Sequence, residues 1–241
     1  MNPKKRLLLI SNSVQYGRGY LEHAEDELRS FLGGVKRVLF VPYALKDRDA
    51  YAQTAQAKFA QLGFALDSIH RAPDPRKAVE SAEALFIGGG NTFRLLKNLY
   101  ENRLLDAIRA RVENGMPYVG SSAGSVVSCP TIRTTNDMPI VEPPSLTSLG
   151  LISFQLNCHY VDADPSSTHM GETRAVRLRE FHEENETPVV GIREGSMLRV
   201  EDGTIVLKGT TGAKIFRRGE TPSEITPGTI VDPFQPAGAP R

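Results

Sequence analysis

Residues 120–124 read Gly-Ser-Ser-Ala-Gly and follow a short apolar segment at 116–119. A G-x-S-x-G segment at the end of a strand places its central serine on a sharp turn, with the N-terminus of a helix beneath the hydroxyl. Ser122 is the central residue, so we predict that it is a catalytic nucleophile. An ordinary turn uses the same residue types. The prediction therefore requires a base, an acid and an oxyanion site elsewhere in the chain.

Histidine is the usual base for such a serine, because a neutral imidazole within hydrogen-bond reach can accept the hydroxyl proton. Ligands of open α/β sheets bind beyond the carboxyl ends of the strands, so a histidine directly after a strand is favoured. His159 follows the run 151–157 and is our preferred base, whereas His169 lies in the loop before a predicted helix. The other histidines lie inside predicted helices or lack an evident partner: His23, His70 and His182.

Three carboxylates compete for the role of orienting the imidazole. Glu194 follows the apolar run 188–192 and precedes Gly195, which places it at the carboxyl end of a predicted strand. Asp162 and Asp164 belong to the loop after the preferred base. The strand position favours Glu194. An ordinary surface turn would also suit it, since its neighbours are typical turn residues.

A glycine-rich turn, Gly-Gly-Gly-Asn-Thr at 88–92, lies between the apolar strand 84–87 and a predicted short helix. Its backbone N–H groups could bind a phosphate or a developing oxyanion. The turn lacks the Lys-Ser/Thr pair of a P-loop and is not G-x-G-x-x-G, which disfavours nucleotide binding. With a serine nucleophile present, we predict an oxyanion site formed by the amides of Gly89, Gly90 and Ala123.

Short apolar runs alternate with segments of helical periodicity along most of the chain. Continuous apolar runs are typical of strands buried on both faces. Their alternation with helices predicts the α/β class, as one domain over 1–241 with an open, mostly parallel sheet and helices on both faces. The expected strands are at 6–11, 37–43, 84–88, 117–120 and 188–192. The expected helices are at 20–32, 47–62, 92–99, 104–113 and 173–184.

The pattern changes after Gly195. Strand-like runs at 197–200, 204–207 and 213–216 are joined by turns that contain glycine, which predicts a β-meander within 196–217. The tail at 233–241 contains three prolines and no periodic pattern, so we expect it to be flexible.

Composition excludes several classes of function. The 241 residues include 29 Lys and Arg against 28 Asp and Glu, and the net charge of +1 offers no electrostatic footprint for nucleic acid. The two cysteines, Cys129 and Cys158, form no disulfide framework, which favours a reducing compartment. The apolar run 7–10 is too short for a signal peptide or a membrane span. We expect a cytoplasmic protein that binds neither nucleic acid nor membranes, with its oligomeric state open and a homodimer compatible with the sequence.

The catalytic candidates occur in the order Ser122, His159, Glu194. An α/β-hydrolase has its acid before its histidine. The chain therefore has the nucleophile turn without the residue order of that fold, and it requires another family.

Several segments resemble the peptidase E family of α-aspartyl dipeptidases, and the resemblance covers nearly the whole chain. The block at 131–140 is its most specific part, because generic strand or turn chemistry does not require it. The resemblance implies a serine exopeptidase that hydrolyses dipeptides with N-terminal aspartate, without a cofactor, on a sheet related to the class I glutamine amidotransferases. The segments that carry it are 88–93, 120–124, 130–140, 159–160, 171–174 and 194–195.

The resemblance also implies roles for single residues. Ser122, His159 and Glu194 match the nucleophile, base and acid of the family, in agreement with the assignments made from strand ends. Arg174 resembles the arginine that binds the aspartate carboxylate, a role for which a guanidinium fork is suited. Arg133 competes for that role.

Two further residues are candidates for binding the substrate, and two positions differ from the residues usual in the family. Asn136 and Asp137 are our candidates near the α-amine of the substrate. Ser121 stands where relatives carry a bulky aromatic residue, and Cys158 where they often carry proline. We expect these two departures to change the packing of the pocket and not the reaction, with Cys158 a packed thiol.

Two other functions remain as alternatives. A metal-dependent hydrolase would use a polar cluster in the region 159–172, although no H-E-x-x-H motif or cysteine pair supports it. A flavodoxin-like protein that binds a small molecule without turnover would use the turn at 88–92. The residues of the metal alternative are His159, Asp162, Asp164, His169 and Glu172.

Overall fold

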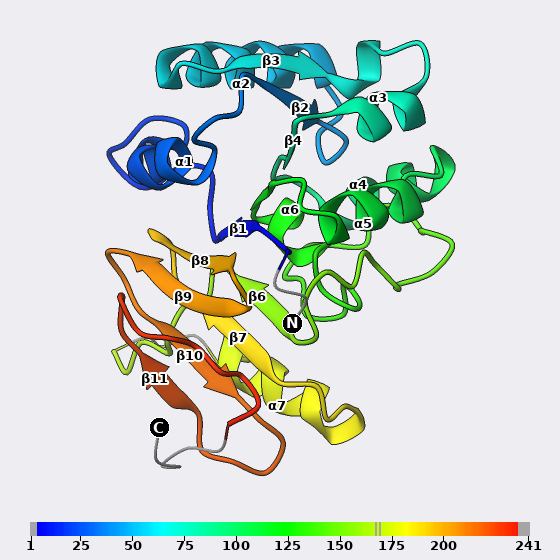
Figure 1. Ribbon diagram of the computed structural model, residues 1–241. Coiled ribbons are helices and arrows are strands. Elements are labelled where there is room, and N and C mark those ends of the chain that lie inside the picture. The colour runs from blue at the N-terminus through cyan, green and yellow to red at the C-terminus, as the bar shows by residue number, and fades with distance from the viewer. Residues whose placement is uncertain (1–3, 167, 169, 236–241) are drawn as a thin grey trace.

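The computed structural model describes residues 4–166, 168 and 170–235, and it forms two sheets with helices around them (Figure 1). The larger sheet has seven strands in the order β3-β2-β4-β5-β1-β8-β9. Its first five strands are mutually parallel, and β8 and β9 continue it in antiparallel pairing. The strands are β1 (Leu7–Ile10), β2 (Arg37–Val41), β3 (Ala65–Ser68), β4 (Ala84–Ile87), β5 (Tyr118–Ser121), β8 (Ser196–Glu201) and β9 (Thr204–Gly209).

Both faces of the larger sheet are buried, as its continuous apolar runs predict. Successive side chains of a strand point to opposite faces. In β1, Leu8 and Ile10 therefore pack with one set of helices, and Leu7 and Leu9 pack with the other. The first face carries η1 (Glu22–Ala24), α1 (Glu25–Phe31) and α2 (Arg48–Leu62). The second face carries α3 (Pro75–Ser81), α4 (Thr92–Glu101), α5 (Leu105–Glu113) and α6 (Ala123–Val126).

The smaller sheet has four strands in the order β11-β10-β7-β6, below the larger sheet in Figure 1. The strands β6 and β7 are parallel, and the crossover between them contains α7 (Arg174–Glu184). Tyr160, Leu178, Val189 and Phe216 form a small cluster between α7 and this sheet. The strands are β6 (Gln155–Cys158), β7 (Val189–Ile192), β10 (Ala213–Phe216) and β11 (Ser223–Ile225).

The expectation of one continuous β-meander at 196–217 requires correction. The strands β8 and β9 form a hairpin, but β10 pairs with β7 and β11 in the other sheet. Ala213 and Ile215 of β10 lie opposite Ile192 and Val190 of β7, and all four side chains are buried in the main core. This burial decides the pairing, since the turns at 202–203 and 209–212 look alike in sequence. The predicted tail lies largely outside the described residues, which end at 235.

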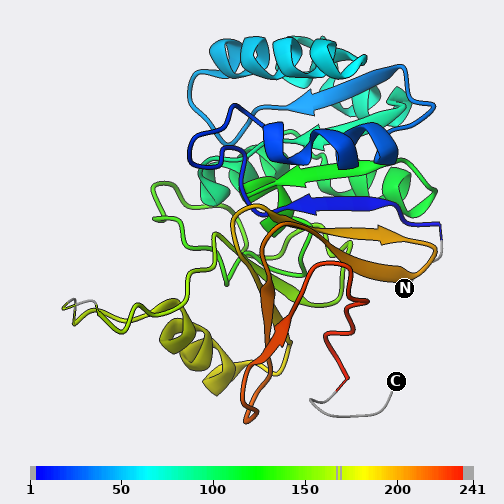
Figure 2. The same cartoon turned by 90° about the vertical axis from the view of Figure 1, so that its left-hand side faces the viewer.

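The carboxyl ends of β1, β2, β4 and β5 meet at one edge of the larger sheet (Figure 2). Ser11, directly after β1, links this edge to the smaller sheet. Its hydroxyl donates to the carbonyl of Ile192 at 2.8 Å and accepts from the N–H of His159 at 2.9 Å. The ends of β6 and β7 are thereby held beside the end of β1. In the described part of the chain, no helix combines the length and apolar character needed to cross a membrane.

Candidate active site

Ser122 stands on the sharp turn that the sequence predicts. It caps the N-terminus of α6 with φ 51° and ψ −112°, a region that a residue with a side chain rarely adopts. Its N–H donates to the carbonyl of Ile10 at 2.9 Å, and its own carbonyl accepts from Ser125 and Val126. These bonds fix the backbone on both sides of the hydroxyl. The strained conformation is therefore maintained by the sheet and by α6 together.

The two glycines of the motif allow the elbow to lie against its neighbours. A Cβ on Gly124 would lie 2.0 Å from the carbonyl oxygen of Ile87, and one on Gly120 would lie 2.5 Å from the carbonyl oxygen of Gly124. Real Cβ atoms do not approach so closely. Because both obstacles are backbone atoms, a side-chain rotation cannot relieve either contact. The glycines are required by close packing of α6 on β4 and β5.

A chain of hydrogen bonds joins the three residues predicted as nucleophile, base and acid. Ser122 Oγ lies 2.9 Å from His159 Nε2, and His159 Nδ1 lies 2.7 Å from Glu194 Oε1. A carboxylate only accepts, so Nδ1 carries a proton and Nε2 is the acceptor for the serine hydroxyl when the imidazole is neutral. The side chains of His159 and Glu194 are 41% and 47% exposed, which leaves the pair accessible from solvent. Each of the three residues follows or ends a different strand, as the strand-end argument expects.

The other carboxylates that competed with Glu194 have different partners. Asp164 accepts from the N–H and hydroxyl of Ser166 at 2.8 and 2.7 Å. Asp162 binds Arg193, whose Nε and Nη2 donate to its Oδ2 at 2.9 and 2.6 Å. Burial raises the pKa of Asp162, but hydrogen bonds from Lys214 and Arg193 outweigh it and hold the pKa below its ordinary value. Asp162 is therefore an ionised partner of two cations, and among the described residues it forms no hydrogen bond with His159.

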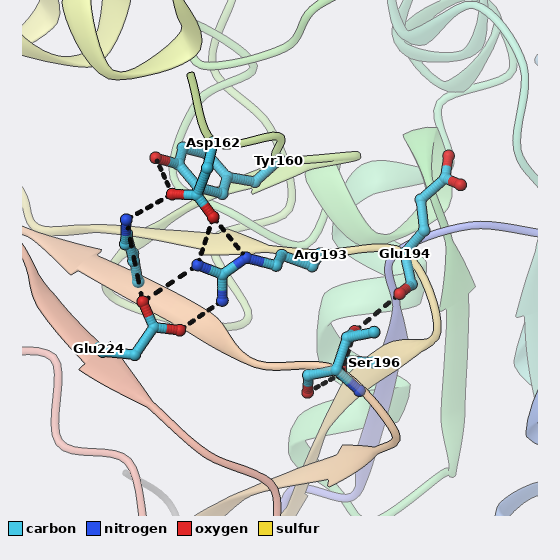
Figure 3. A network of polar contacts seen from close by, with 8 residues as sticks. Tyr160, Asp162, Arg193, Glu194, Ser196 and Glu224 are labelled. Carbon is cyan, nitrogen blue, oxygen red and sulfur yellow. Dashed lines mark hydrogen bonds and ion pairs between the residues drawn. The ribbon is translucent and has the colours of Figure 1, made fainter. Parts of the chain in front are cut away.

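Arg193 is the centre of a cluster that we call the Arg193 cluster, formed by Tyr160, Asp162, Arg193, Lys214 and Glu224. The guanidinium also donates through Nη2 to Glu224 Oε2 at 3.0 Å and through Nη1 to Oε1. Its hydrogen bonds to Glu224 and Asp162 outweigh partial burial and raise its pKa. The Tyr160 hydroxyl donates to Asp162 Oδ1 at 3.3 Å. Figure 3 shows the Arg193 side chain directed at both carboxylates.

Two members of the Arg193 cluster are sequence neighbours of the predicted base and acid. Tyr160 follows His159, and Arg193 precedes Glu194. Figure 3 shows the Glu194 side chain pointing away from the cluster. The cluster therefore ties together the backbone segments from which His159 and Glu194 project, without forming hydrogen bonds to either side chain among the described residues.

The backbone amides predicted to stabilise the oxyanion lie close to Ser122. Ala123 is the first residue of α6, so its N–H has no acceptor within the helix. The glycine turn passes directly over the elbow, since a Cβ on Gly89 would lie 3.1 Å from Cβ of Ser122. Gly90 has a φ of +129°, which L side chains rarely adopt.

Asp137 and Asn136 have structural partners that the sequence did not reveal. Asp137 Oδ2 accepts from the N–H and the hydroxyl of Thr92 at 2.8 and 2.5 Å, at the N-terminus of α4, where a negative charge is stabilised. Asn136 Nδ2 donates to the carbonyl of Cys158 at 2.7 Å. The two residues thus hold the loop at 130–140 between α4 and the end of β6, next to His159. Among the described residues, the hydrogen bonds of the Asp137 carboxylate all use Oδ2, which leaves Oδ1 for a ligand.

Arg174 is the first residue of α7 and is half-buried. Within the described residues, its guanidinium has no ion-pair partner. Burial and the nearby charge of Arg177 lower its pKa, and the charge of Asp137 acts in the opposite direction. A partly desolvated guanidinium without a carboxylate is suited to bind an anionic group. Arg133, the competing candidate, is exposed.

The residues of the metal alternative do not form one group in the described structure. His169 lies outside the described residues. Among those that are described, no three or more His, Cys, Asp or Glu side chains are placed to hold a metal ion together.

A model of the family described as peptidase family S51 matches residues 7–208. The chain belongs to this family. Peptidase E of Streptomyces coelicolor is 53% identical to this S51 peptidase over 223 residues, 92% of each chain. The probable alpha-aspartyl dipeptidase of Drosophila melanogaster is 46% identical over 230 residues, which cover 94% of this chain and 96% of the relative. A solved peptidase from an acI-B1 actinobacterium shares the fold with a TM-score of 0.69 at 18% identity, over 94% of this chain and 96% of that one.

Some residues of this S51 peptidase that shape the site were missed in the sequence. Ser11 joins the two sheets beside His159, and its only signal is a polar residue directly after an apolar strand. The Arg193 cluster has no local signal, because its members come from distant segments. Cys158 is confirmed as a buried thiol, and burial raises its pKa to about 12. It therefore stays protonated near neutral pH and is a poor nucleophile.

Proposed function

We propose that this S51 peptidase is a serine dipeptidase that releases aspartate from dipeptides with aspartate at the N-terminus. The observation that carries the proposal is the hydrogen-bonded chain from Ser122 through His159 to Glu194, on an elbow at the carboxyl edge of the sheet. The names of relatives 53% and 46% identical support the substrate class. The free, buried cysteines suit a reducing compartment, and we place the enzyme in the cytoplasm.

The geometry supports an acyl-enzyme mechanism. Ser122 Oγ attacks the carbonyl of the aspartyl residue while His159 Nε2 accepts its proton. The same nitrogen then returns the proton to the leaving amine, and water hydrolyses the ester. Glu194 holds the imidazole and stabilises its protonated form. The amides of Ala123 and the glycine turn stabilise the oxyanion.

Substrate selection follows from the charges near the elbow. We assign the side-chain carboxylate of the substrate to the guanidinium of Arg174, which has no ion-pair partner among the described residues. We assign its α-amine to Asp137 Oδ1. Asn136 positions this loop through its bond to Cys158. An asparaginyl dipeptide would leave the guanidinium without its partner, which typically costs about 2 to 5 kcal/mol. We therefore expect rates on Asn-X far below those on Asp-X.

The test is release of free aspartate by the purified protein from Asp-Leu, with Asn-Leu, Glu-Leu and N-acetyl-Asp-Leu as comparisons. Ser122→Ala is expected to lower the rate by about 10⁴-fold or more. Ser121→Ala is the matched control, because it removes a neighbouring hydroxyl that lies 2.8 Å from Ser13 Oγ. Activity that survives Ser122→Ala, or is lost equally in both variants, would contradict the mechanism.

The same assay separates the two arginines. Arg174→Ala is expected to lower the rate on Asp-Leu by orders of magnitude, and Arg174→Lys to recover part of it, because a point charge does not reproduce the guanidinium fork. If Arg133→Ala removes the preference for Asp over Asn while Arg174→Ala keeps it, the carboxylate pocket is misassigned.

A further inference from the structure

A hollow adjoins the elbow on the side of α1 and α2. We call it the Leu45 hollow, because Leu45 lies on its wall, and the loops after β1, β2 and β4 line it. Val14 and Leu45 are apolar residues that are 54% and 38% exposed there. The rings of Tyr20 and Tyr51, packed edge to face at 6.2 Å, line its base. Exposed apolar side chains around a hollow offer burial to an apolar group.

The Leu45 hollow reaches the nucleophile. Gly89 and Ser13 line it, and a Cβ on Gly89 would lie 3.0 Å from Ser13 Oγ and 3.1 Å from Cβ of Ser122. Gly90, one of the proposed oxyanion donors, also lines it. A substrate whose carbonyl lies on Ser122 would therefore have one of its two residues beside this hollow.

A different hollow lies on the other side of the elbow. It contains Arg174 and is bounded by the segments 161–164 and 171–177. Figures 1 and 2 both show α7, which begins with Arg174, and α2, which borders the Leu45 hollow, on opposite sides of β1. A dipeptide has one residue on each side of its scissile bond. With the aspartyl residue on the Arg174 side, the second residue lies on the Leu45 side.

A cation stands at the rim of the Leu45 hollow. Lys46 is exposed and has no ion pair or hydrogen bond of its side chain among the described residues. The neighbouring Asp47 also lies on the rim, but its carboxylate accepts from the N–H of Ala50 at the start of α2 at 2.9 Å. The second residue of a dipeptide ends in a free carboxylate, so Lys46 has the complementary charge.

We propose that the Leu45 hollow is the subsite for the second, leaving residue, that it favours an apolar side chain such as leucine, and that Lys46 binds the terminal carboxylate. This inference rests on the proposed function, because it needs the aspartyl residue on the Arg174 side. It accounts for selectivity at the second residue of the dipeptide, which Ser122, His159 and Glu194 do not determine.

The experiment compares kcat/KM for Asp-Leu, Asp-Gly and Asp-Leu-amide in the wild type, Leu45→Ser and Lys46→Ala. The wild type is expected to favour Asp-Leu over Asp-Gly by about tenfold or more. Leu45→Ser should reduce this ratio to about threefold or less, mainly through a lower kcat/KM on Asp-Leu, whose side chain would lie in the hollow. Lys46→Ala should reduce the preference for Asp-Leu over Asp-Leu-amide by about two- to fivefold, the range of an exposed ion pair.

The controls are Ile230→Ser, at an exposed aliphatic residue, and Lys77→Ala, at an exposed lysine; neither residue lines the hollow. Circular dichroism and melting temperature confirm that each variant is folded. Aspartate release with ratios unchanged by Leu45→Ser and Lys46→Ala would overturn the subsite and leave the proposed function intact. No aspartate release from any dipeptide by the wild type would overturn the proposed function, and the subsite with it.

Discussion

Gly124→Ala is a test of why the elbow needs glycine. The substitution adds one methyl group at a helical position, where alanine is normally preferred to glycine by about 1 kcal/mol. In this structure the new Cβ would lie 2.0 Å from the carbonyl oxygen of Ile87 and 2.7 Å from its carbonyl carbon. These atoms belong to β4, which pairs with β5 in the middle of the sheet. Neither the added methyl group nor the strand can move aside by a change of rotamer.

Two opposing contributions, overpacking and helix propensity, decide whether Gly124→Ala raises or lowers the free energy of unfolding. Overpacking a well-packed interior typically costs about 1 to 3 kcal/mol, and a backbone obstacle favours the upper end of that range. The gain from helix propensity is small, because α6 has only four residues. We expect a net loss of about 2 kcal/mol in the free energy of unfolding. A shift of α6 away from β4 would also displace Ser122 and the Ala123 amide, and a misplacement of about 1 Å can cost about 100-fold in rate.

The measurements are urea unfolding and kcat/KM on Asp-Leu. The control is Gly33→Ala, whose Cβ would lie 3.5 Å from the nearest atom, the carbonyl oxygen of Ser30, which is an ordinary contact. We expect the control to change the free energy of unfolding by about 0.5 kcal/mol or less and to keep full activity. If Gly124→Ala is as stable and active as the wild type, close approach to Ile87 is not the reason for this glycine.

Two further predictions concern the Arg193 cluster and a buried histidine. Arg193→Ala is expected to lower kcat on Asp-Leu by about tenfold with little change in KM, because the cluster positions the segments that carry His159 and Glu194. Arg193→Lys is expected to restore part of the lost kcat. An unchanged kcat in Arg193→Ala would exclude this positioning role. Burial, together with Arg218, lowers the pKa of His182, so the unfolded chain binds its proton first as pH falls and stability declines below about pH 7. In urea unfolding at pH 7.5, 6 and 5, the free energy of unfolding should therefore decline less in His182→Phe than in the wild type. Part of the decline is expected to remain in this variant, because burial also lowers the pKa of His23. Equal declines in the two proteins would contradict the assignment of the pH dependence to His182.

Local sequence signals were sufficient for the elements around the site. The apolar runs predicted β1, β2, β4, β5 and β7 to within about two residues at each end, since strands buried on both faces need no partner to be recognised. The strand β3 and the helix α3 were missed. Their signals are weaker: β3 alternates buried and exposed residues over only four positions. The Asp74 cap and Pro75 at the start of α3 were available as a local signal.

The candidate triad was also accessible from sequence, because strand ends converge in an open parallel sheet. The G-x-S-x-G spacing after an apolar run selected Ser122, and the position at a strand end ranked His159 and Glu194 above their competitors. The choice between Glu194 and Asp162 nevertheless depended on tertiary structure. Asp162 pairs with Lys214 and Arg193, which lie more than thirty positions away in the chain, and so it is a weaker candidate for orienting the imidazole.

What the sequence determined by itself is therefore the local chemistry: the glycines that permit a serine elbow, the apolar runs that must be buried, and the polar residues that follow them. Only the tertiary structure decided which turn leads to which sheet and which charged groups pair. The strand β10 leaves the hairpin of β8 and β9 because its apolar face is buried against β7. Asp137 accepts from the first residue of α4, and the Arg193 cluster joins strands of the smaller sheet to the loop after His159. These contacts depend on distances between segments far apart in the chain, and a local pattern carries no information about such distances.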